Sequence, residues 1–318
     1  MTMSKFPHGV SSFGMPVIPM WTTGNVFFVN SATGSNTVSD GKDPIHPVAT
    51  LAQAISKATA SNGDLIIVMP GHAETVTTSR AINKAGITIM GLGNGDLRPT
   101  FTLTGQVPLF SVSAANVSVH NIKFYSATAS TSYAMNLLRV AASNFTLSDC
   151  EFRTAQKMYH TVRIVSGDQV TIKDSVFVHT YAPGAGAAGI KNQNCILNIG
   201  GTNVVIKNCR FNDTSADAAY KWKAVIEGGK LTASLNVVDC DFVCRGIATR
   251  TRTAAASGFM ATKYCRGISP SSNTAVGGLF LATYQFILES YNVAAVNKIG
   301  VIAVTTSDIR FKRQVMYL

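Results

Sequence analysis

Strict alternation of apolar and polar positions recurs in five segments of the chain. Each has two apolar residues at alternate positions, then Asn or Asp, then a small or apolar residue, and ends on Phe. A period of two predicts strands, and Asn or Asp between two short strands predicts a sharp bend. The segments are Asn116–Phe124, Asn144–Phe152, Gln169–Phe177, Asn203–Phe211 and Ser234–Phe242.

Units of this kind, repeated along a chain, predict a right-handed parallel β-helix in which equivalent side chains of successive coils stack in columns. One inward column should contain Phe124, Phe152, Phe177, Phe211 and Phe242. A second should contain Ile122, Cys150, Ser175, Cys209 and Cys240. The bends should fall at Asn121, Asp149, Asp174, Asn208 and Asp239, residue types that tolerate a left-handed backbone.

The beginning of the chain predicts a cover for the open end of this solenoid. Residues 46–64 read as a short amphipathic helix, with Leu51, Ala54 and Ile55 on its apolar face together with Ala58. We therefore expect an all-β chain: a solenoid with a short N-terminal capping helix and an extended N-terminal arm. The predicted divisions are an arm at 1–23, a cap strand and helix at 24–64, a parallel β-helix at 65–305 and a basic tail at 306–318.

The charge balance favours acidic partners. The chain is 46% hydrophobic and 14% charged, with 27 Lys and Arg against 16 Asp and Glu. A formal charge of +11 suits an acidic protein lattice or an anionic polysaccharide. No aromatic residues interleave with a basic run, so nucleic acid is an unlikely partner. The basic contact candidates are Arg245, Arg250, Arg252, Lys312 and Arg313.

The cysteines and histidines predict neither a metal site nor a cofactor. The six cysteines contain no C-x-x-C pair, and three of them fall in the small-residue column, which predicts reduced core residues. The histidines have no metal-binding spacing. No apolar run of 18 residues occurs, so we expect no membrane partner.

Several stretches resemble known families. The succession of strand, helix and G-D-x-I-x-V-x-P-G-like strand resembles the N-terminal part of pectate-lyase-like β-helix proteins. More specifically, the chain resembles a family of tailed-phage virion proteins, in the segments Ser4–Pro19, Thr23–Asn36, Asn62–Thr75, Ile87–Leu103 and Leu288–Val304. This resemblance implies a capsid decoration or cement protein on the exterior of the phage head. Its implied partners are the major capsid protein and further copies of itself, often in a homotrimer.

The proline-rich arm carries apolar side chains that cannot form a core alone. Two interpretations stay open: the arm docks on another subunit, or it packs along its own solenoid. The arm residues expected to make these contacts are Phe6, Phe13, Met15, Val17, Ile18 and Trp21.

Two other functions remain open, a tailspike-like polysaccharide depolymerase and a receptor-binding tail protein. The weak candidate for a catalytic carboxylate pair is Glu151 with Asp241, separated by two coils and hence by about 10 Å or more. Arg153, Arg163 and Arg210 could supply the arginine base of a lyase, but no cluster of three acids accompanies them. We therefore expect a structural protein without catalytic residues, with at most weak glycan contact.

Overall fold

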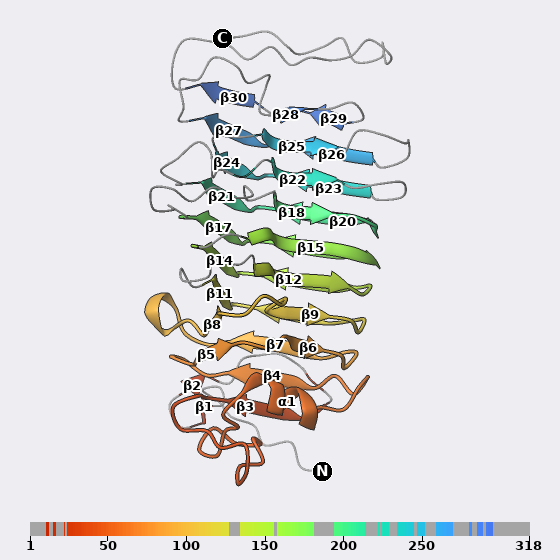
Figure 1. Cartoon of the computed structure of the whole chain (residues 1–318). Coiled ribbons are helices and arrows are strands. Elements are labelled where there is room, and N and C mark those ends of the chain that lie inside the picture. Colours follow the sequence, from red (N-terminus) through yellow and green to blue (C-terminus); the bar gives the residue numbers. More distant parts are fainter. Residues whose placement is uncertain are drawn as a thin grey trace.

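The fold is a right-handed parallel β-helix, as the repeats predicted. The computed structural model describes residues 11–12, 15–16, 22, 24–126, 134–155, 158–180, 194–213, 222, 224–228, 234–244, 247–251, 259–269, 280–281, 285–288 and 291–294. Three long sheets of parallel strands wind into one stack, in which β3 and β30 lie near opposite ends (Figure 1). Each coil contributes one strand to each sheet in turn.

The strands are short, and each pairs with its equivalent in the next coil. The first sheet contains β3 (Val26–Val29), β4 (Leu65–Val68), β7 (Thr88–Gly91), β10 (Ser118–His120), β13 (Phe145–Ser148), β16 (Val170–Lys173), β20 (Val204–Lys207), β23 (Ser234–Val238), β26 (Phe259–Lys263) and β29 (Gln285–Leu288). The second contains β5 (Ala73–Val76), β8 (Thr100–Leu103), β11 (Lys123–Ser126), β14 (Glu151–Thr154), β17 (Val176–His179), β21 (Arg210–Asp213), β24 (Asp241–Val243), β27 (Arg266–Ser269) and β30 (Tyr291–Ala294).

The third sheet carries the longest strands. It contains β6 (Arg80–Ile82), β9 (Phe110–Val112), β12 (Ala134–Ala141), β15 (Met158–Asp168), β18 (Asn194–Asn198), β22 (Ala224–Gly228), β25 (Ile247–Thr251) and β28 (Phe280–Leu281). The short strand β19 (Gly201–Thr202) pairs with the end of β15. A 3-10 turn, η1 (Gly95–Leu97), interrupts the connection between β7 and β8.

The predicted columns are confirmed by the strand register. Phe124, Phe152, Phe177, Phe211 and Phe242 are direct register neighbours, with ring centroids 4.6–5.0 Å apart and interplanar angles of 5–13°. The stacked rings are fully or almost fully buried. Phe101 extends the column by one coil. The inward residues of each unit therefore build one continuous core.

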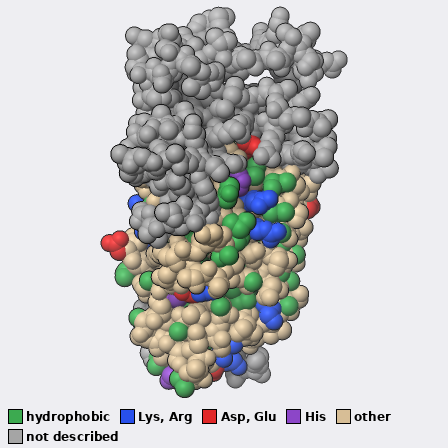
Figure 2. Space-filling view, viewed as in Figure 1, with side chains coloured by type: hydrophobic (Ala, Val, Ile, Leu, Met, Phe, Trp, Pro, Cys, Tyr) green, Lys and Arg blue, Asp and Glu red, His purple; other side chains and the backbone are tan. Residues whose placement is uncertain are grey.

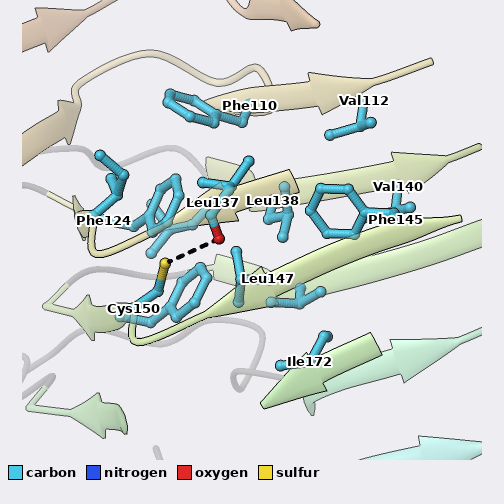
Figure 3. Packing of buried hydrophobic residues seen from close by; sticks show 14 of the residues in the cluster. Phe110, Val112, Phe124, Leu137, Leu138, Val140, Phe145, Leu147, Cys150 and Ile172 are labelled. Atoms are coloured by element: carbon cyan, nitrogen blue, oxygen red, sulfur yellow. Dashed lines mark hydrogen bonds between the residues drawn. The ribbon is translucent and has the colours of Figure 1, made fainter. Parts of the chain in front are cut away.

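The small-residue column is also buried and contains free thiols. Cys150, Cys209, Cys240 and Cys265 each lie with Sγ 3.2–3.3 Å from the carbonyl oxygen two residues earlier. Burial raises the pKa of Cys150 to about 12, so this thiol is un-ionised at neutral pH. Figure 3 shows Cys150 beside Phe124 and Leu137 in the core between the sheets.

Left-handed residues turn the chain at two corners in several of the coils that the structure describes. The predicted bends at Asn121, Asp149, Asp174, Asn208 and Asp239 have φ of 50–56°. A second row of corners, unrecognised in the sequence, falls between the third and first sheets. Its members are Asn116, Asn144, Gln169 and Asn203, with φ of 51–58°. Side chains also bond along the rows, as where Asn208 Nδ2 donates to Asp174 Oδ1 at 2.8 Å.

The predicted helix forms at the N-terminal end as α1 (Leu51–Lys57), which buries Leu51, Ala54 and Ile55. It contacts β3, β4 and β6. Thr50 caps the helix by accepting a hydrogen bond from the amide of Gln53. The preceding strand β3 pairs with β4 in parallel, so the strand expected in the cap is also the outermost strand of the first sheet.

Much of the predicted arm and tail lies outside the described residues. Within the arm, β1 (Ser11–Ser12) and β2 (Met15–Pro16) form a two-stranded antiparallel pair. The boundaries at 23 and 305 remain predictions. Among the described residues, no helix is both long enough and apolar enough to span a membrane.

Candidate functional site

The predicted carboxylate pair is too widely separated for a two-carboxylate glycosidase. Glu151 is the register neighbour of Val176, Val176 of Arg210, and Arg210 of Asp241. Three strand spacings place the two acids about 14 Å apart along the stack, whereas such enzymes hold their carboxyl groups about 5–9.5 Å apart. Glu151 is also ion-paired, with Arg98 at 3.6 Å and with Arg153. Its charge is therefore already balanced.

Other sequence candidates fall largely outside the described structure. Phe6, Phe13, Val17, Ile18 and Trp21 of the arm are not described, and only the backbone of Met15 is. Arg245, Arg252, Lys312 and Arg313 are likewise outside the described residues. Arg250 lies in β25, but its side chain is not described. The arm and the basic contact residues therefore remain predictions.

A buried polar pair lies in the second sheet, at the last residues of β17 and β21. His179 Nδ1 lies 3.1 Å from Asp213 Oδ1, and both side chains are inaccessible to solvent. Asp213 also accepts a hydrogen bond from the backbone amide of Trp222, whose ring stacks on His179 with centroids 5.2 Å apart. With no exposure to solvent, this pair holds the core together and offers no surface for a ligand.

The third sheet brings together polar groups that the sequence did not group. Arg139 of β12 and Arg163 of β15 are register neighbours, followed on the next two strands by Leu197 and Glu227. Both arginines are half-buried, and Glu227 is fully buried. Neighbouring strands in a sheet lie about 4.8 Å apart, so two positive charges occupy adjacent positions on one face.

The arginines adjoin buried residues on both strands. Leu137 and Leu138 of β12 both belong to the core and are labelled in Figure 3. Asn136 before them is buried, and Arg139 after them is half-buried. In β15, His160, Thr161 and Val162 are likewise buried, and Arg163 after them is half-buried.

Exposed apolar side chains lie further along the same two strands, about 13 Å from the arginines. Met135 and Tyr159 retain 39% and 37% of their accessible surface, and each lies four residues before an arginine on the same strand. Figure 2 shows Lys and Arg side chains alongside hydrophobic ones on the face in view. A surface of cationic and apolar groups can bind an anion that also carries an apolar face.

Asn136 is a buried polar side chain of the same sheet. It is 1% exposed, and neither its Nδ2 nor its Oδ1 has a hydrogen-bond partner within the described structure. Leaving a buried polar group unsatisfied costs about 1–3 kcal/mol. The buried Nε of Arg163 is also without a partner there. The third sheet is therefore the candidate ligand-binding face of the described chain.

The sequence carries only a weak signal for this site. It offers Arg163 as a candidate for a lyase base, but no pattern in it marks Arg139, Asn136, His160 or Glu227. The loops between the second and third sheets differ in length, so the two arginines do not stand at equal distances from the phenylalanines of their units. Among the described residues, no group of three or more His, Cys, Asp or Glu is arranged to hold a metal ion.

Comparisons of the sequence identify no family: no family model matches the chain, and no curated protein matches it. Comparisons of the structure do find similar folds. A rhamnogalacturonan lyase superposes with a TM-score of 0.53 and 14% identity, covering 85% of this chain and 74% of the enzyme. At this identity the likeness shows the fold alone.

Two further solved structures are more distant. The pectin methylesterase from Aspergillus niger gives a TM-score of 0.48 at 11% identity, over 87% of this chain and 89% of that protein. The ORF18 protein of Geobacillus virus E2 gives 0.34 at 13% identity, over 76% and 57%.

The expectation that the chain is not an enzyme needs correction. The rhamnogalacturonan lyase shows that an enzyme is built on the same architecture, so the fold gives no ground for excluding catalysis. The separation of Glu151 from Asp241 rules out only that particular pair. Together, the repeat register and the structural likeness show that this chain is a right-handed parallel β-helix, the fold that it shares with the rhamnogalacturonan lyase.

Proposed function

We propose that this protein is a component of a tailed-phage particle that binds the exterior of the head as a decoration or cement protein, as a homotrimer. The observation that carries this proposal is the resemblance of five segments, from Ser4–Pro19 to Leu288–Val304, to tailed-phage virion proteins. The major capsid protein is the proposed partner.

The closed N-terminal end of the solenoid supports a role for the arm in this attachment. Helix α1 already covers that end, and Leu51, Ala54 and Ile55 are buried beneath it. The solenoid therefore does not need the arm as its cap. An apolar segment that is not needed by its own domain is available to bind a neighbouring subunit.

Deletion of residues 1–22 should abolish or strongly weaken binding to purified heads that lack the protein, while leaving the solenoid folded. Binding is measured by co-sedimentation with the heads, and folding by circular dichroism.

Quantitative mass spectrometry of purified virions should find the full chain in a fixed ratio to the major capsid protein. Unchanged binding of the deletion variant would show that the arm does not attach the protein to the head. Only a few copies of the chain per particle would show that the protein belongs to the tail.

A second candidate is an enzyme that acts on polysaccharide, as in tailspike-like depolymerases. The observation that favours it is that the third sheet carries His160 and Arg163 on β15 and Glu227 two strands further along, on β22, because imidazole and carboxyl groups can transfer protons beside a cationic binding site. Incubation with polygalacturonate should then release new reducing ends. His160→Gln should suppress this release, whereas His120→Gln, on the first sheet, should not. A polymer of unchanged length would reject this candidate for that substrate.

A further inference from the structure

The three strands at the N-terminal end of the solenoid differ in what covers their outer edges. Outside β3, the amide of Phe28 donates to the carbonyl of Gly41 at 2.7 Å, and the amide of Val48 donates to the carbonyl of Phe28 at 2.9 Å. Helix α1 contacts β6, the first strand of the third sheet. The first and third sheets are therefore covered at this end, which leaves β5, the first strand of the second sheet.

The outer edge of β5 is open at Thr75. The carbonyls of His72 and Val76 accept hydrogen bonds from the amides of the next coil, at 2.8 and 3.1 Å. Successive residues of a strand bond to opposite sides, so the N–H and C=O of Thr75 point away from that coil. On this outer side the amide of Ala73 donates to Ser31 Oγ at 3.0 Å. Within the described chain, no hydrogen bond reaches the outward N–H or C=O of Thr75, and the residue is exposed.

The arm contains the complementary feature, a hairpin without a sheet to join. Strands β1 and β2 pair with one another, with Ser12 opposite Met15, and with no other strand of the described chain. A hairpin of two strands is marginally stable alone in water and gains stability from a third strand. Figure 1 draws the hairpin and β5 at the same end of the solenoid, but the single chain leaves them unpaired.

We propose that the β1–β2 hairpin of one copy of this chain adds to the open edge of β5 in a second copy. Such a contact joins two different surfaces, so it repeats from copy to copy until the ring closes. Closure with three copies uses every hairpin and every edge. The inference rests on the proposed homotrimer and names the contact that holds it together.

Proline determines which strand of the hairpin lies next to β5. Pro16 of β2 has no N–H to donate, and proline in sheets is confined largely to edge strands. Strand β1 therefore pairs with β5, and β2 becomes the new edge. A proline on an edge discourages the addition of a further strand. Each copy consequently accepts one hairpin.

An exposed apolar side chain adjoins this edge. The carbonyl of Leu97 accepts a hydrogen bond from the amide of Gly71 at 2.8 Å, two residues before β5 begins. The side chain of Leu97 retains 60% of its accessible surface. The hairpin segment carries Phe13 and Met15, which suit an apolar surface. The contact between copies therefore combines backbone hydrogen bonds with burial of apolar groups.

The test is the oligomeric state of the purified chain, measured by analytical ultracentrifugation in the absence of heads. The full chain should sediment as a trimer. Thr75→Pro removes the outward N–H of β5, to which no described residue is bonded, and should yield monomers. Deletion of residues 1–16 removes the hairpin and should also yield monomers. Thr75→Val is the matched control, because it changes the same side chain but keeps the N–H, and it should remain a trimer. Thermal unfolding verifies that each variant is folded.

A mixture of the two monomeric variants separates exchange between copies from pairing within one chain. The Thr75→Pro chain keeps its hairpin and the deleted chain keeps its edge, so together they should form a dimer of one copy each. A monomeric full chain, or a mixture without this dimer, would overturn the proposal. A trimer that persists in Thr75→Pro would show that the copies meet through another surface, which also overturns it. Because no heads are present, a trimer that later fails to bind heads would count against the proposed function alone.

Discussion

Phe177→Ala should lower the free energy of unfolding by about 3–5 kcal/mol, the cost of replacing a fully buried aromatic ring by a methyl group. Phe177 is 0% exposed and stacks between Phe152 and Phe211, at centroid distances of 4.7 and 4.8 Å. Its loss removes two ring contacts and leaves a cavity in the middle of the column. Urea denaturation followed by circular dichroism measures the effect.

The control for this variant is a substitution of the preceding residue. Val176 belongs to the same strand but faces outward and is 38% exposed. Val176→Ala should therefore change the unfolding free energy by no more than about 0.5 kcal/mol. A similar loss for both variants would mean that the strand, and not the aromatic column, determines stability. A negligible loss for Phe177→Ala would contradict the packing described for the core.

Glu74→Ala should destabilise the N-terminal end by about 3–5 kcal/mol, because it leaves a buried charge network without its centre. The Glu74 carboxylate is paired with Arg80 at 2.6 Å and with His72 at 3.3 Å. It also accepts a hydrogen bond from the backbone amide of Leu51, the first residue of α1. Removing it therefore loosens the capping helix as well as β5. Hydrogen exchange of the α1 amides measures the local effect.

The pH dependence of this effect has a definite sign. Burial by itself raises the pKa of Glu74, but hydrogen bonds from His72, Leu51 and Arg80 outweigh it and hold the pKa below its ordinary value of 4.5. A lowered folded-state pKa gives stability that is present above about pH 4.5 and is lost as the pH falls through the folded value. The difference between wild type and variant should therefore shrink in acid.

Two controls complete this experiment. Glu74→Gln keeps an acceptor for the amide of Leu51 but removes the charge. It should therefore lower the free energy of unfolding less than Glu74→Ala does. Glu151→Ala removes a more exposed carboxylate that is also paired with arginines, and should cost about 0–1 kcal/mol. A pH-independent difference for Glu74→Ala would show that charge at this position contributes nothing to stability.

The sequence by itself determined that the chain winds into a stack of parallel β-coils. Inward positions such as Phe152 and Leu147 recur with a period of two around a fixed Asn or Asp bend, and only a stack of parallel coils buries all of them at once. The helix over Leu51–Lys57 was also predictable, because its apolar face and its Thr50 cap are local features.

Only the tertiary structure decided the surface chemistry. Side chains on one face of a solenoid come from different coils, and loops of unequal length separate them along the chain, so no fixed spacing links Arg139 to Arg163. The separation of Glu151 from Asp241 likewise depends on how many coils intervene. A repeat specifies its own core because every unit supplies the same buried positions. Its outward positions vary from coil to coil, and the register of the strands determines which of them meet.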